Sequence, residues 1–308
     1  MLKTKQNRKK LFVFAKLILF AGVLFLIYLQ LRKVGSEQWN DFHLERPLMI
    51  LLSILLVIPN IYLAFLKWKI TLKTLSIASS RSLRVQSFFA GIVTGLVTPN
   101  MIGNFLGRFY YFNRSHRIQI TLFTLISNFG QFVSTITFGW IAVLALGGFL
   151  SIEYSDNYTI GVGLLLIGSY LSFFFIENFA LRFRKKRYFL EFKSVLMNAK
   201  SYRLKILALS GLRFLIFTLQ YSLMIYAFGE ELNLTLIFAI WQVYLITMVF
   251  PSLILGKIGI KEVVGIAILG ALGVNEFAVI FTSLIIWFVN TCFPALVGLV
   301  LCRSKFQK

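Results

Sequence analysis

Long runs of apolar residues, separated by short loops that hold most of the charged residues, recur along the whole chain. A helix needs about 20 apolar residues to cross a hydrocarbon core of about 30 Å, because it rises about 1.5 Å per residue. The pattern therefore predicts an all-α integral membrane protein, with the first run as a retained anchor. Six runs reach this length and predict full transmembrane helices at residues 11–31, 47–66, 120–148, 158–177, 206–229 and 277–301.

Two further apolar stretches, residues 87–112 and 234–273, are interrupted by Pro99 and Pro251 and by glycines. Proline removes a backbone donor and clashes with the preceding turn. Backbone groups freed in this way are tolerated at membrane depth only beside protein or water. Each stretch therefore predicts a broken or re-entrant hairpin of two short helices. Small residues that favour close packing of the first hairpin's arms are Gly91, Gly95, Gly103 and Gly107.

The composition excludes several classes of protein. The 308 residues include 32 Lys and Arg against 11 Asp and Glu, a net charge of +21, but only 14% are charged and 58% are hydrophobic. A basic domain that binds nucleic acid would carry far more charge, so nucleic acid is not an expected partner. Two cysteines and two histidines cannot build a disulfide framework or a metal-ligand cluster, so we expect neither metal nor cofactor.

The loop charges predict an orientation. Basic residues concentrate at both chain ends and in the loops at 67–86, 113–119 and 180–205, whereas the other loops hold most of the acids. Lys and Arg accumulate on the cytoplasmic side, which predicts a multi-pass protein of the cell (inner) membrane with both termini cytoplasmic. The loop at 180–205 also has apolar residues at helical spacing. It predicts a basic amphipathic helix, which either lies on an anionic leaflet or is a linker that only sets orientation.

The two broken stretches suggest an internal repeat. Gly107 follows Pro99 at the same spacing at which Gly259 follows Pro251, and the predicted topology runs the second unit in the opposite direction. Two half-units of opposite orientation, each with a discontinuous helix, are typical of transporters. The expected organisation is an anchor at 1–31, a half-repeat at 47–148, a connecting helix with linker at 158–205, and a half-repeat at 206–302.

Four charged residues remain inside the broken stretches: Arg108, Lys257, Lys261 and Glu262. A charge at the centre of a membrane helix costs about 2.5–3.5 kcal/mol on insertion scales, so these side chains must face protein or water. We expect Arg108, Lys257 and Lys261 to line a hydrated cavity that accepts an anionic head group, with Glu262 orienting Arg108. The alternative is an internal ion-pair network that only holds the two halves in register.

Other polar residues in the apolar segments have less specific interpretations. Lys16 and Arg213 lie near predicted cytoplasmic helix ends, from which long basic side chains extend to the membrane surface. Asn104, Asn128 and Gln131 are candidates for extending a substrate path. Polar side chains of this kind also hydrogen-bond between helices, and this interpretation stays open.

At the broken stretches the sequence resembles the lysylphosphatidylglycerol synthase transmembrane-region family, through TPNMIGNFLGR at 98–108 and FPSLILGKIGIKE at 250–262. Trp68 also resembles a family feature. Asn104 stands where the family usually has an acid, and Lys261 where it often has Arg. The first difference weakens the case for any coupling that needs a carboxylate in the first hairpin. The matching residues are Pro99, Gly103, Gly107 and Arg108 in the first motif, and Pro251, Gly259, Lys261 and Glu262 in the second.

The resemblance implies a flippase that moves a lipid or a lipid-linked glycan between leaflets, and the basic residues favour an anionic head group. One alternative is a non-catalytic accessory subunit that anchors a lipid or glycan synthase through the basic loops. Another is an integral membrane lipid-linked transferase, which would need a positioned base or nucleophile. The apolar segments offer only Glu262 and the interfacial Glu177, and no histidine. We therefore do not expect an enzyme.

Overall fold

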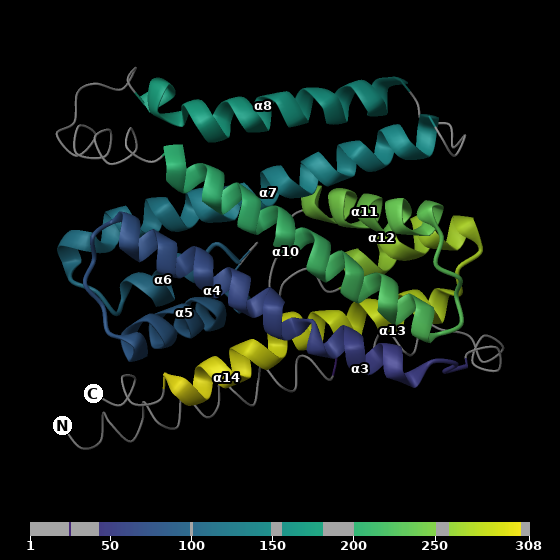
Figure 1. Cartoon of the computed structure of the whole chain (residues 1–308), viewed down its shortest axis with the longest axis horizontal. Helices are drawn as coiled ribbons and strands as arrows, with labels where there is room; N and C mark the ends of the chain where they lie inside the picture. The colour runs from purple at the N-terminus through teal and green to yellow at the C-terminus, as the bar shows by residue number, and fades with distance from the viewer. Residues whose placement is uncertain are drawn as a thin grey trace.

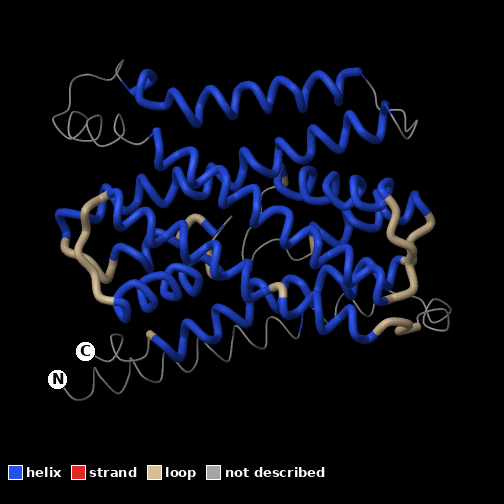
Figure 2. Tube along the Cα trace, in the orientation of Figure 1, coloured by secondary structure: helices blue, strands red, loops and turns tan. Residues whose placement is uncertain are grey.

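The described part of the structure is entirely helical. Because the long runs contain few charges, those that the structure describes form long helices, which lie along one common direction (Figures 1 and 2). The structure is a computed structural model, and it describes Phe25 and residues 43–98, 101–148, 156–180, 200–250 and 259–302.

Within these ranges, five stretches of helix are long and apolar enough to cross a membrane. They match five of the six predicted full helices, although the helix predicted at 47–66 continues to Thr74. The predicted first helix at 11–31 lies, apart from Phe25, outside the described residues. The helices are α3 (Pro47–Leu55) with α4 (Val57–Thr74), α7 (Arg117–Gly148), α8 (Asp156–Ala180), α10 (Lys200–Ala227), and α13 (Glu276–Trp287) with the π-helix η5 (Phe288–Cys292) and α14 (Phe293–Leu301).

Each broken stretch forms two short helices that pack against each other, as its proline and glycines predict. The first pair is α5 (Arg81–Leu96) with α6 (Asn104–Phe109), and the second is α11 (Leu234–Val249) with α12 (Ile260–Leu269). Figure 1 shows the two pairs in opposite halves of the bundle. Pro99 and Pro251 lie outside the described residues. Short 3₁₀ turns at Arg114–His116 and Gly270–Leu272 lead into α7 and out of α12.

Glycines and one threonine bring the arms of the first pair close together. A Cβ atom on Gly107 would lie 2.2 Å from the carbonyl oxygen of Ala90, so only glycine fits this approach. The Thr94 hydroxyl donates to the Gly103 carbonyl oxygen (2.8 Å) and accepts from the Gly107 amide (3.1 Å). This hydroxyl therefore links α5 directly to the backbone of α6 and of its N-cap residue Gly103. The expected role of these glycines in close packing is confirmed.

The loops gather at the two ends of the bundle and separate the charges. The loops after α4 and α6 and the end of α14 lie at one end, which we call the basic end (Figure 1). The start of α3, the α10–α11 loop and the α12–α13 loop lie at the other, the acidic end. Described loop and helix-end residues at the basic end include Lys73, Arg81, Arg84, Arg114 and Arg117; those at the acidic end include Glu45, Asp156, Glu230, Glu231 and Glu276.

Each short-helix pair also contacts a long helix from the other half of the sequence. The arm α5 packs on α14 and the arm α11 packs on α7, while α10 contacts α3, α4 and α7 near the middle of the molecule. Helix α8 lies on the outside against α7, and much of its apolar surface is exposed. An exposed apolar surface of this kind suits contact with lipid. Polar groups gather instead between the two short-helix pairs.

Candidate functional site: a polar cavity between the two hairpins

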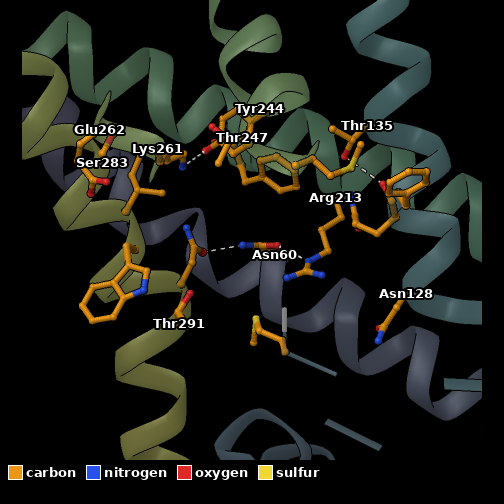
Figure 3. Close-up of a pocket in the computed structure, with 18 residues that line it drawn as sticks. Asn60, Asn128, Thr135, Arg213, Tyr244, Thr247, Lys261, Glu262, Ser283 and Thr291 are labelled. Carbon is orange, nitrogen blue, oxygen red and sulfur yellow. Dashed lines mark hydrogen bonds between the residues drawn. The ribbon is translucent and has the colours of Figure 1, made fainter. Parts of the chain in front are cut away.

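A cavity of about 580 Å³ lies where the two short-helix pairs approach the long helices (Figure 3). Residues from α4, α7, α10, α11, α12, α13 and η5 line it, together with Met101 from the segment before α6. We call it the central cavity. Its polar and charged lining residues are Asn60, Asn128, Gln131, Thr135, Arg213, Tyr244, Thr247, Lys261, Glu262, Ser283, Asn290 and Thr291.

One wall of the central cavity is a chain of hydrogen bonds that fixes Arg213. The Arg213 Nε donates to Asn60 Oδ1 (2.7 Å), and the Asn60 amide donates to Asn290 Oδ1 (2.6 Å). The Asn290 amide donates to Gln220 Oε1 (2.9 Å), and the Gln220 amide donates to the Ser53 carbonyl oxygen (3.0 Å). Because each oxygen is used as an acceptor, each amide has a defined orientation. Arg213 therefore presents its terminal guanidinium nitrogens toward the cavity, as Figure 3 shows.

Asn290 occupies a special backbone position, within the π-helical turn Phe288–Cys292. A π-turn inserts one residue into a helix, and so changes which side chains face a given direction. Pro294 follows in the next turn and has no backbone N–H, which favours a local break. The break directs Asn290 and Thr291 toward the cavity.

The hydrogen-bond chain leads to a stability prediction for Asn290→Leu. The substitution leaves the Asn60 amide nitrogen and Gln220 Oε1 without their bonds to Asn290. We therefore expect the free energy of unfolding to fall by about 2 kcal/mol. The fall is measured as a lower unfolding midpoint in detergent. Asn128→Leu is the matched control, because Asn128 is exposed and its bonds to Asn104 are long (3.3 and 3.4 Å). Equal midpoints for the two variants would contradict the chain's structural role.

The opposite wall of the cavity holds Lys261. Its Nζ donates to the Tyr244 hydroxyl (2.7 Å) and lies 4.0 Å from the centroid of the Tyr244 ring and 5.1 Å from that of Tyr221. The Tyr221 hydroxyl pairs with Ser283 Oγ (3.0 Å), which holds this ring in place. The aromatic rings stabilise the ammonium group. Among the described residues, no carboxylate forms an ion pair with Lys261.

Glu262 has a structural task at the start of α12. Its Oε2 accepts the Gly259 amide (2.6 Å), and its side chain is only 3% exposed. A carboxylate in the first turn also interacts favourably with the helix dipole. Gly259 has φ of 86°, a conformation that favours glycine and sets the direction in which α12 begins. The pair therefore positions Lys261 in the first turn of α12.

A comparison with protein families shows which family the chain belongs to. The family model described as "Lysylphosphatidylglycerol synthase TM region" matches residues 13–298, which is nearly the whole chain. The chain belongs to this family. The resemblance read from the two motifs is confirmed, and the protein is a multi-pass membrane protein. Searches of curated proteins and of solved structures returned no match.

The residues matched to the family motifs lie in different surroundings. Lys261 and Glu262 line the central cavity, and so do the candidates Asn128 and Gln131. Asn104 reaches Asn128 from α6. The Gln131 amide also donates to the Ser210 carbonyl oxygen (3.2 Å), so it both lines the cavity and joins two helices. Lys257 lies outside the described residues.

Arg108, the arginine of the first family motif, does not lie where we expected. Its guanidinium carbon lies 5.0 Å from the Trp68 ring centroid and 5.7 Å from the Phe88 ring centroid, and Arg108 is not among the residues that line the central cavity. The predicted contact with Glu262 is not formed, because Glu262 caps α12 in the other half of the bundle. The repeat argument related the two motifs, but it did not determine how far apart they lie.

Two cations of this family member have roles that sequence analysis missed. Arg213 was expected to extend to the membrane surface, yet it lines the central cavity. It lies more than three turns after the start of α10, which is too deep for its side chain to reach the end of the helix. Lys67 was assigned to a loop, but α4 continues past it and leaves Lys67 only 5% exposed. The depth of Arg213 in its apolar run was a usable signal.

The site offers little to a metal ion. Among the residues that the structure describes, no group of three His, Cys, Asp or Glu side chains could hold one. Both cysteines are buried and unpaired. The chemistry that the described cavity supports is recognition by cations, amides and hydroxyls.

Proposed function

We propose that the protein transports an anionic lipid, or an anionic lipid-linked glycan, between the leaflets of the cell membrane. The observation that carries the proposal is that Arg213 and Lys261 face the same cavity of about 580 Å³ (Figure 3). Neither makes an ion pair with a described carboxylate. The described lining holds these two cations and the single carboxylate of Glu262, which also caps α12. A phosphate head group would balance the excess positive charge, and both cations can donate hydrogen bonds to it.

The packing of the helices supports an inverted repeat that relates α3–α4 to α10, α5–α6 to α11–α12, and α7 to α13–α14. Under this relation the contact of α5 with α14 corresponds to the contact of α11 with α7. The contact of α6 with α7 likewise corresponds to that of α12 with α13, and all four contacts exist. Asn60 and Arg213, 153 residues apart, bond to each other at nearly equivalent positions of the repeat. Substrate sites of transporters with this architecture lie at the interface of the repeats.

The proposed mechanism alternates access to the central cavity from the two membrane surfaces. The pair α5–α6 lies in the half of the bundle nearer the basic end, and the pair α11–α12 lies in the half nearer the acidic end (Figure 1). Movement of one pair at a time would open the cavity to one leaflet while the other stays closed. The basic end faces the cytoplasm in this proposal, following the distribution of Lys and Arg.

The proposal assigns transport and not catalysis. Glu262 is the carboxylate of the described cavity lining, and one of its oxygens accepts the backbone amide of Gly259. This bond holds the carboxylate at the start of α12. A general base must instead reach the proton that it removes from a substrate.

Transport is tested with purified protein in liposomes that contain a trace of fluorescent phosphatidylglycerol. A membrane-impermeant reductant added outside destroys only the fluorophores in the outer leaflet. We expect the protein to expose the inner-leaflet phosphatidylglycerol to the reductant, and to act much more slowly on phosphatidylcholine, whose head group has no net charge. Loss of fluorescence at the protein-free rate for every lipid would contradict the proposal.

A further inference from the structure

Lys67 is a buried cation that forms no ion pair with any carboxylate in the described part of the chain. Its Nζ donates to the Ser127 carbonyl oxygen (2.8 Å) and to Ser210 Oγ (2.7 Å), at the junction of α4, α7 and α10. An ammonium group has three donors, so these two neutral acceptors leave one unused. Burial of a charge without an opposite charge is costly, since neutral acceptors replace its hydration only in part. A protein that needed Lys67 only for packing would be better served by an apolar side chain.

Arg108 is a second buried cation in the same half of the bundle. It is 8% exposed, and its Nε has no hydrogen-bond partner. Its guanidinium lies over the ring of Trp68, the neighbour of Lys67 on α4. Helix α5 confines it from another side, because a Cβ atom on Gly91 would lie 2.8 Å from the Arg108 Cγ. The aromatic ring stabilises the charge but accepts no hydrogen bond in the guanidinium plane.

A polar bridge connects these two cations to the central cavity. Asn104 lies one turn before Arg108 on α6 and bonds to Asn128 of α7. Asn128 lines the central cavity and directly follows Ser127, whose carbonyl oxygen accepts from Lys67. Arg213 lies one turn after Ser210 on α10, and three like charges in one half of a bundle disfavour one another. Among described residues no carboxylate forms an ion pair with any of the three.

We infer that Lys67 and Arg108 form a second binding site for a phosphate group, located between the central cavity and the basic end. Asn60 lines the central cavity, and Lys67 lies about 10 Å beyond it along α4, given the rise of a helix. The second site is therefore distinct from the site that contains Lys261. A bound phosphate accepts the unused donors of both side chains and removes their repulsion. The inference rests on the proposed function, because it assigns this site as the first stop of a head group that enters from the basic end.

The test measures the unfolding midpoint of delipidated protein in non-ionic detergent, alone and with a probe. The probes are dioctanoyl phosphatidylglycerol, inorganic phosphate and dioctanoylglycerol, which lacks the phosphate. We expect phosphatidylglycerol at saturation to raise the midpoint by about 5 °C or more, and dioctanoylglycerol to leave it unchanged. A rise with inorganic phosphate as well would identify free phosphate as a ligand, and no rise with it would restrict the site to lipid.

Variants assign the rise to the second site. Lys67→Met and Arg108→Met should each reduce the rise to less than half, and should unfold no lower than wild type without ligand because repulsion is removed. Lys69→Met and Arg114→Met are matched controls. Lys69 is exposed two residues after Lys67 on α4, and Arg114 is exposed in the 3₁₀ turn after α6. Both variants should retain the full rise. A full rise in Lys67→Met and in Arg108→Met would overturn the inference.

The two proposals fail separately in these experiments. If liposomes show transport while the rise is unaffected by Lys67→Met and Arg108→Met, the second site is refuted and the transport proposal stands. If the rise depends on both residues but liposomes show no transport, the phosphate site stands and the transport proposal fails.

Discussion

Replacing Lys261 by glutamine is expected to slow transport of phosphatidylglycerol in liposomes by about 10- to 100-fold, and Arg213→Gln should have an effect of the same size. Each substitution removes one charge-assisted contact to the head group, which is worth about 1.5–3 kcal/mol. Glutamine keeps donor capacity and much of the volume of the side chain. The loss therefore measures charge, and the rate of fluorescence quenching by the external reductant reports it.

Conservative variants separate charge from packing. Lys261→Arg keeps the charge beside Tyr244 and should retain most of the rate. Lys69→Gln removes an exposed charge from α4 and should leave the rate unchanged. A normal rate in both Lys261→Gln and Arg213→Gln would show that neither cation touches the transported group.

Gly107→Ala is expected to be the most destabilising single-methyl substitution in the first hairpin. The added Cβ would meet the backbone carbonyl group of Ala90, with its carbon at 2.4 Å and its oxygen at 2.2 Å. Backbone atoms cannot rotate away as a side chain can, so α6 must move away from α5 and Thr94 loses its bond to the Gly107 amide. We expect a loss of about 3 kcal/mol or more, seen as a lower unfolding midpoint in detergent.

The matched control is Gly161→Ala on α8, where an added Cβ meets nothing within 4 Å. Alanine favours the helical conformation over glycine by about 1 kcal/mol, so this variant should be as stable as wild type or more stable. A Gly107→Ala variant as stable as Gly161→Ala would show that the arms of the first hairpin do not approach as closely as described.

The spans were predictable because length and hydrophobicity alone decide whether a helix crosses a membrane. The short-helix pairs were also predictable, since a proline with nearby glycines in each stretch predicts a break in the helix. The position at which the span formed by α3 and α4 ends was not predictable from the sequence. Lys67, Lys69 and Lys73 resemble a cytoplasmic loop, but the backbone continues as α4 to Thr74, because nothing between them breaks a helix.

The candidate site was predicted only in part, for a physical reason. A charge inside an apolar segment must face protein or water, which drew attention to Lys261 and Glu262, and both line the central cavity. The sequence does not say in which direction a side chain points, and Arg108 packs against Trp68 outside the lining of the central cavity. The chain of amides that orients Arg213 depends on contacts between residues as far apart as Asn60 and Asn290, which no local pattern encodes.

The most direct test of the account is to block the central cavity reversibly in protein that is otherwise unchanged. Thr291 lines the cavity, so Thr291→Cys, made in a protein with Cys292 and Cys302 replaced by alanine, offers one thiol there. A bulky methanethiosulfonate reagent should stop phosphatidylglycerol transport, and a reductant that releases the label should restore it. Labelled Gly161→Cys on the outer helix α8 should transport normally. Undiminished transport by fully labelled Thr291→Cys would contradict passage of the head group through this cavity.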